Sequence, residues 1–128
     1  MTDDRAPTGQ LPPALPARPG VDPLAAGLTA AEVDRFSREH LEHARRLVAA
    51  VRALASAPDD ELRWDTVLAP LDDVAFATSL AGGFAGLMEE THPDAAVREA
   101  GRACRPRLVS FQTDMMLDAE LACVVRRF

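Results

Sequence analysis

The sequence contains no lysine and no tyrosine, and only two of its 128 residues are cysteines. All fourteen basic residues are arginines, and twenty acidic residues leave a formal net charge of −6 at pH 7. A general nucleic-acid binder needs concentrated positive charge to neutralise phosphates, so this balance excludes that class. Cys104 and Cys123 lack the short spacing of zinc ribbons and redox motifs, and we expect both thiols to stay reduced.

Long apolar runs are also missing. No stretch of about eighteen apolar residues, near the length a bilayer requires, runs without a charge. Residues 1–5 lead into prolines, whereas a secretory signal has an apolar segment of about 7–15 residues there. We therefore expect a cytoplasmic protein that does not bind membranes.

Proline is concentrated at the amino end, where residues 1–23 hold six of the ten prolines. Proline lacks a backbone donor and does not fit helix interiors, so this arm is expected to be disordered. Residues 11–16 include a P-x-x-P spacing that suits an aromatic groove. A solvated tail is the simpler interpretation of the same residues.

Residues 24–128 are expected to form one all-α domain, an antiparallel bundle of three long helices plus a short C-terminal helix. Thr29 and Glu32 have the spacing of a capping box that starts the first helix, and Pro58 ends it. The apolar residues of this helix recur in steps of three and four, as one buried face requires. They are Val33, Phe36, Ala44, Leu47, Val48, Val51, Leu54 and Ala55.

A second helix over residues 64–88 is expected to be the centre of the bundle. Asp65 is the predicted N-cap, and Pro70 marks either a kink or the true start of the helix. Gly82, Gly83 and Gly86 indicate close helix contact or an early end. The predicted buried stripe is Trp64, Val67, Leu68, Leu71, Val74, Ala77, Leu80, Ala81, Phe84, Leu87 and Met88.

A third helix is predicted to begin with Pro93 at its first position and Asp94 near its positive end. Pro106 should bend it. Its apolar stripe is Val97, Ala100, Cys104, Leu108, Phe111 and Met115. Residues 118–128 read as the first turns of a fourth helix without a capping glycine or polar tail, which indicates the amino-terminal part of a longer protein.

Few residues have the pattern of a reactive site. His40 and His43 lie three apart on one helix, but two ligands from one turn do not make a zinc site, and the spacing is not that of a zincin. We expect His40 at the boundary of the core and His43 in solvent. His92 precedes the third helix, where its ring is placed to cap.

Candidate nucleophiles have no recognisable activating partner. Ser79, Ser110, Cys104 and Cys123 lack an elbow motif or an obvious base, and no phosphate-binding loop is present. The series Arg98, Arg102, Arg105 and Arg107 is expected to form a solvated face paired with Glu99 and Asp94, or alternatively to contact a carboxylate or another domain. We predict no catalytic, cofactor-binding or metal-ligating residue in this chain.

Several segments in collinear order carry a family resemblance. They read PL at 23–24, LTAAEV at 28–33, WDTVLAPLDD at 64–73, THPD at 91–94, REA at 98–100 and ACRPRLVSFQTDM at 103–115. The chain from about residue 22 to 128 resembles the amino-terminal helical region of the thimet oligopeptidase family of zinc metallopeptidases, which includes oligopeptidase A and dipeptidyl carboxypeptidase.

The resemblance implies a nearly all-helical enzyme with a deep channel that admits short peptides. Zinc, held by an H-E-x-x-H helix and a downstream Glu, would be the cofactor of the complete enzyme only, because that motif is absent here. The resemblance gives this region the role of a channel wall that packs against the missing C-terminal catalytic half. The alternatives are a free-standing helical module that binds a partner helix or self-associates, and a small metalloprotein using His40 and His43.

Overall fold

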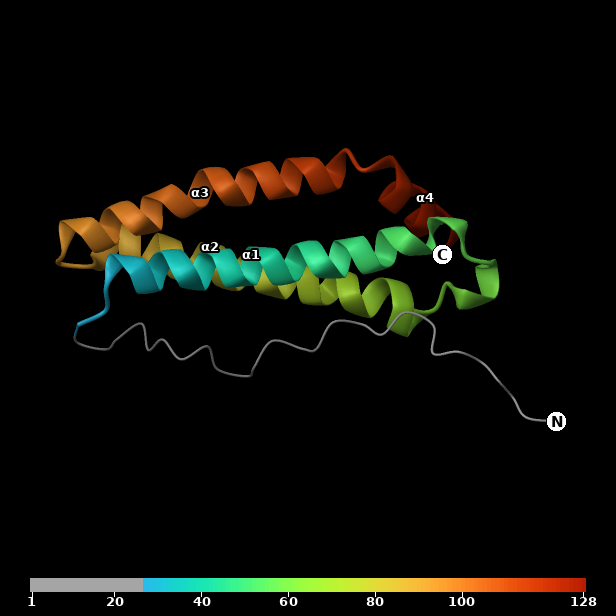
Figure 1. Cartoon of the computed structure of the whole chain (residues 1–128), viewed down its shortest axis with the longest axis horizontal. Helices are drawn as coiled ribbons and strands as arrows, with labels where there is room; N and C mark the ends of the chain where they lie inside the picture. The colour runs from blue at the N-terminus through green and yellow to red at the C-terminus, as the bar shows by residue number, and fades with distance from the viewer. Residues whose placement is uncertain (1–26) are drawn as a thin grey trace.

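Three long helices lie side by side in antiparallel order, and a short fourth helix packs at one end (Figure 1). The computed structural model describes residues 27–128, so the proline-rich arm and its P-x-x-P spacing lie outside the described residues. The helices are α1 (Ala30–Arg52), α2 (Ala69–Thr91), α3 (Ala95–Met116) and α4 (Ala119–Arg127). The predicted all-α bundle of three long helices and a short C-terminal helix is confirmed.

The start of α1 has the predicted capping box. The Thr29 hydroxyl accepts a hydrogen bond from the Glu32 amide at 3.2 Å, and the Glu32 carboxylate accepts from the Thr29 amide at 2.8 Å. Two amides that have no partner within the helix are thereby satisfied. At the other end, α1 passes into a 3₁₀ turn, Ala53–Ser56, and stops before Pro58 as predicted.

The entry to α2 differs from the prediction. Residues Trp64–Leu68 form one π-helical turn, and regular α-helix begins at Ala69 with Pro70 in its first turn, where its missing N–H costs nothing. Pro70 therefore marks the start of the helix and not a kink. Asp65 is not the cap, because its carboxylate pairs with Arg63 at 3.2 Å. Thr66 organises the start of the helix instead, because its hydroxyl accepts a hydrogen bond from the Arg63 amide and donates one to the Glu61 carbonyl.

The turn into α3 is capped by Asp94, whose carboxylate accepts from the Ala96 amide at 2.8 Å. Pro93 precedes this cap, so the prediction that it occupies the first helical position is wrong by two residues. The helix continues through Pro106 to Met116. Asp118 then caps α4 by accepting from the Leu121 amide at 2.9 Å.

The core runs along the line where α1, α2 and α3 meet. Its larger cluster lies toward α4, and its smaller cluster contains the rings of Phe36 and Phe84, which contact each other at a tilt of 47° with centroids 4.4 Å apart. Two members of the predicted α2 stripe are not in it: Trp64 is 66% exposed and Leu87 is 44% exposed. The π-helical turn contains an extra residue, which rotates Trp64 away from the core. Leu87 lies on the side of α2 that faces neither α1 nor α3.

Helix Trp64–Thr91 is long and apolar enough, by length and composition alone, to cross a membrane, which the sequence analysis did not anticipate. The stretch without charge, residues 74–88, is shorter than the roughly 20 residues that a bilayer requires. The buried side chains of α2 lie against α1 and α3, as in the central helix of a bundle. We read the apolar character of this helix as that of a core element.

Candidate functional site

No metal centre is assembled within residues 27–128: no three His, Cys, Asp or Glu side chains there are grouped to hold an ion. The features with unusual chemistry are a buried histidine pair on α1 and a close crossing of α2 and α3. Both are built by helix-to-helix packing, and neither juxtaposes a nucleophile with a base.

The histidine pair is more deeply buried than the sequence predicted. His40 is 2% exposed and its Nδ1 donates to the Phe36 carbonyl oxygen at 2.8 Å. His43 is 3% exposed, so the expectation that it lies in solvent is wrong. Its Nδ1 has no hydrogen-bond partner among the described residues. Residues 36, 40 and 43 share one helical face, and that face turns toward α2, which explains why both rings are enclosed.

Burial controls the protonation of His43. Loss of solvent lowers the pKa of the imidazole below its ordinary value of 6.5, and Arg46 and His40 act in the same direction, while Asp73 on α2 opposes them. His43 is consequently neutral at pH 7. A neutral imidazole with one unpaired nitrogen in a buried interface destabilises the bundle.

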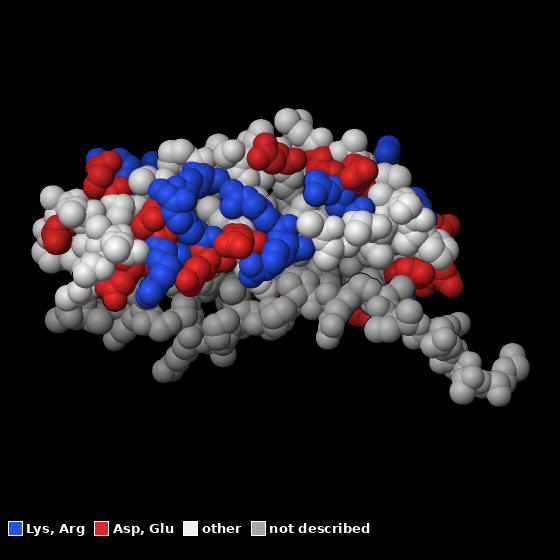
Figure 2. Space-filling model, in the orientation of Figure 1, with Lys and Arg blue, Asp and Glu red and all other residues white. Residues whose placement is uncertain are grey.

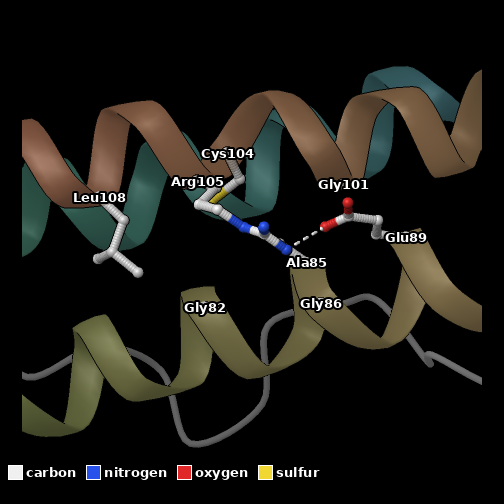
Figure 3. Close-up of a pocket in the computed structure, with 8 residues that line it drawn as sticks. All are labelled: Gly82, Ala85, Gly86, Glu89, Gly101, Cys104, Arg105 and Leu108. Atoms are coloured by element: carbon white, nitrogen blue, oxygen red, sulfur yellow. Dashed lines mark hydrogen bonds and ion pairs between the residues drawn. The ribbon is translucent and has the colours of Figure 1, made fainter.

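The α2–α3 crossing is the closest approach of two helices in the bundle that a glycine permits. A Cβ atom placed on Gly101 would lie 2.5 Å from the Ala85 carbonyl oxygen and 2.9 Å from the Glu89 nitrogen. Figure 3 shows the small pocket of about 150 Å³ beside this crossing, with Gly82 and Gly86 on its α2 side and Cys104 and Leu108 on α3. Of the two readings of the α2 glycines, close helix contact is confirmed at Gly82, where a Cβ would meet Leu108 at 2.9 Å.

Arginines of α3 close this crossing electrostatically. Glu89, whose side chain is 12% exposed, accepts from Arg105 at 2.8 Å and from Arg102 at 3.4 Å (Figure 3 draws the Arg105 contact). Arg102 also pairs with Glu99, as predicted, whereas Arg98 donates to the carbonyls of His92 and Pro93 instead of binding Asp94. The arginine series therefore fastens α3 to α2 and its turn.

Arg107 points to the other side of α3 and pairs with Asp34 on α1, which also holds Arg38 at 2.7 Å. These two arginines hold the pKa of the Asp34 carboxyl below its usual value. Figure 2 shows arginines and carboxylates interleaved over the α1–α3 face, so the charges there satisfy one another.

The remaining candidates have structural positions. The Nδ1 atom of His92 accepts from the Asp94 amide at 3.1 Å, which confirms the predicted capping role. Cys104 is fully buried, Cys123 is partly buried, and both are free thiols. Ser79 and Ser110 are exposed on separate helices with no hydrogen-bonded base among the described residues. No nucleophile–base pair results.

Comparison with known proteins returned no matching family model, no similar curated protein and no similar solved structure.

One surface was missed by the sequence analysis. The side of α2 that faces away from α1 and α3 exposes Phe76 (64%) and Leu87 (44%), with Gly83 between them. The signal was present in the uncharged run of residues 74–88, which is too apolar for a helix with one buried face. We call Phe76, Gly83 and Leu87 the outer face of α2.

Proposed function

We propose that this chain forms a helical wall of the substrate channel in a zinc oligopeptidase of the thimet oligopeptidase type, which hydrolyses short peptides. In this proposal the chain contributes packing surfaces and no catalytic group. Zinc and the catalytic base belong to a C-terminal half of the complete enzyme that is not part of this sequence. The proposal includes a cytoplasmic location, with short peptides as substrates and neither nucleic acid nor membrane as partner.

The observation that supports it best is where the resemblance-bearing residues lie in the bundle. Thr29 and Glu32 cap α1, Thr66 organises the entry to α2, and Asp94 caps α3. Residues 103–115 form the part of α3 that packs on the core through Cys104 and Phe111. These segments define where the helices start and how they pack, which is the structural role expected of a channel wall. A reactive site would require them to converge on one cavity.

Exposed apolar side chains give secondary support. Trp64, Phe76, Val109, Met116 and Leu117 are each more than half exposed. A wall that packs against a second half of an enzyme presents such side chains for burial, because removing apolar area from water stabilises the assembly.

The test begins with the coding sequence that follows the Phe128 codon. We expect it to encode an H-E-x-x-H helix with a Glu further on, and we expect the 128-residue chain alone to leave a quenched fluorescent peptide uncut. A gene with no such motif downstream would refute the proposal.

A second candidate function is a free-standing interaction or dimerisation module without catalysis, and the same exposed side chains favour it. Size-exclusion chromatography with light scattering separates the two. A compact, stable dimer of the isolated chain supports the module, whereas a partly unfolded or aggregating species supports the channel wall. The metalloprotein alternative predicts stoichiometric metal in the purified chain, and metal-free protein would exclude it.

A further inference from the structure

The outer face of α2 has the geometry of an unoccupied helix-packing seam. With Asp72 and Glu90, its residues fall at positions 72, 76, 83, 87 and 90, separated by steps of four, seven, four and three, which is the spacing of one helix–helix contact. Asp72 and Glu90 are eighteen residues apart, so a period of 3.6 residues places them on one line, roughly 27 Å from each other. Between them the face carries no charge.

Gly83, on this side of α2, has no explanation within the chain. A Cβ atom on Gly83 would meet no neighbouring atom within 4 Å, in contrast to Gly82 and Gly101. Glycine destabilises a helix interior relative to alanine, so an open glycine costs stability and gains no contact here. Phe76 and Leu87 are exposed on either side of Gly83. Two protruding apolar side chains that flank a bare stretch of backbone form a surface into which another helix fits.

The charges at the ends of the face decide which helix fits. No residue of 64–91 is basic, and neither Asp72 nor Glu90 forms an ion pair with another described residue. In an antiparallel pair of two copies centred on Ala81, Asp72 would lie opposite Glu90 of the second copy. In a parallel pair each carboxylate would face its own equivalent. Both arrangements place like charges together, which disfavours a second copy of this chain.

We propose that the outer face of α2 binds one apolar-faced helix that carries Arg or Lys at both ends, spaced to meet Asp72 and Glu90. This helix belongs to the other half of the same enzyme, an assignment that rests on the proposed function. The docking contact is then the apolar seam formed by Phe76, Gly83 and Leu87, and the two carboxylates set the register of the partner.

A charge-reversed copy of the chain supplies a defined probe. The variant Asp72→Arg with Glu90→Arg presents the same apolar face with basic ends, as the proposed partner does. Mixed with the wild-type chain, it should form a one-to-one complex in sedimentation velocity and native mass spectrometry. We expect this complex to be roughly tenfold tighter than either self-association, because two repulsive contacts become attractive.

Two further variants make the result specific. Asp60→Arg with Asp114→Arg has the same net charge change at exposed positions away from the face, and it should not associate with the wild type. Gly83→Gln in the wild-type partner should abolish the mixed complex, since its side chain fills the open seam. It should preserve or raise the unfolding midpoint of the monomer, because no atom of the chain lies near that position.

The outcomes separate the possibilities. A mixed sample that associates no more than the Asp60/Asp114 control would overturn the proposal. A wild-type dimer that Gly83→Gln disrupts would also overturn it, by showing that a second copy occupies the face. If the gene encodes no zinc motif, the proposed function fails. The charge-dependent pairing is tested independently of the gene, by the association of the mixed sample.

Discussion

Gly101 on α3 lies directly against the backbone of Ala85 on α2: a Cβ added to Gly101 would be 2.5 Å from the Ala85 carbonyl oxygen. The obstacle is helix backbone, which cannot rotate away as a side chain can. We therefore expect Gly101→Ala to push α2 and α3 apart and to lower the free energy of unfolding by about 1–3 kcal/mol. Urea titration followed by circular dichroism measures this change.

Gly86→Ala is the matched control for the crossing, because a Cβ there meets nothing. It should raise the free energy of unfolding by up to about 1 kcal/mol through helix propensity alone. Equal effects of the two substitutions would contradict the close packing of α3 on α2.

The buried imidazole of His43 predicts acid sensitivity near neutral pH. Its folded pKa is lowered, so the unfolded chain binds a proton first as pH falls through 6.5, and stability present above that pH is progressively lost. Four carboxyls also have a lowered pKa: Glu32, Asp34, Asp65 and Asp118. Their contribution to the stability of the fold is lost only when the pH falls to their ordinary pKa values of 3.8 and 4.5 and below. The decline between pH 7 and 5 should therefore come from His43.

His43→Leu tests that assignment. Thermal unfolding midpoints measured from pH 7.5 to 5 should fall for the wild type and stay nearly flat for the variant. His92→Gln, which changes a histidine in the turn before α3, should keep the slope of the wild type. An unchanged slope in His43→Leu would refute the role of this ring.

Arg127 fastens α4 to the far end of α1. Its guanidinium donates to the carbonyls of Ala55 at 2.8 Å and Ala57 at 2.6 Å, and it pairs with Asp59, which raises the pKa of the arginine. Arg127→Ala leaves those carbonyls without their partner. We expect the contact of α4 with this segment to become less stable.

Amide hydrogen exchange reports this loss locally. Exchange should accelerate across residues 119–127 and remain unchanged in the middle of α1. Arg126→Ala is the control, since the exposed Arg126 has no ion-pair partner within residues 27–128. Identical exchange in both variants would show that α4 is held by Leu121 and Val124 alone.

The helices themselves were predictable because their signals are local. The capping box at Thr29, the turn before Asp94 and the apolar steps of three and four each act within one or two turns of helix. The predicted helix starts that went wrong are those at Asp65 and Pro93: the Asp65 carboxylate pairs with Arg63, and the cap of α3 is Asp94. At the start of α2, Thr66 organises the turn in place of Asp65, because its hydroxyl bonds both an amide and a carbonyl.

The candidate surfaces were less predictable because they depend on how the helices are rotated. A rotation of α1 by about one residue decides whether His43 faces solvent or α2, and the apolar pattern of the sequence did not define that rotation closely enough. The π-helical turn at residues 64–68 likewise moved Trp64 out of the core. The partners of Glu89, thirteen and sixteen residues away along the chain, follow only from the antiparallel crossing of α2 and α3.

The central claim is that this bundle is one wall of a channel in a zinc oligopeptidase, and the most direct measurement is peptide cleavage by the complete protein encoded by the gene. We predict that this protein cuts a short quenched fluorescent peptide, that a chelator removes the activity and zinc restores it, and that a folded protein is left intact. A complete protein that is folded and zinc-loaded yet leaves short peptides uncut would contradict the account.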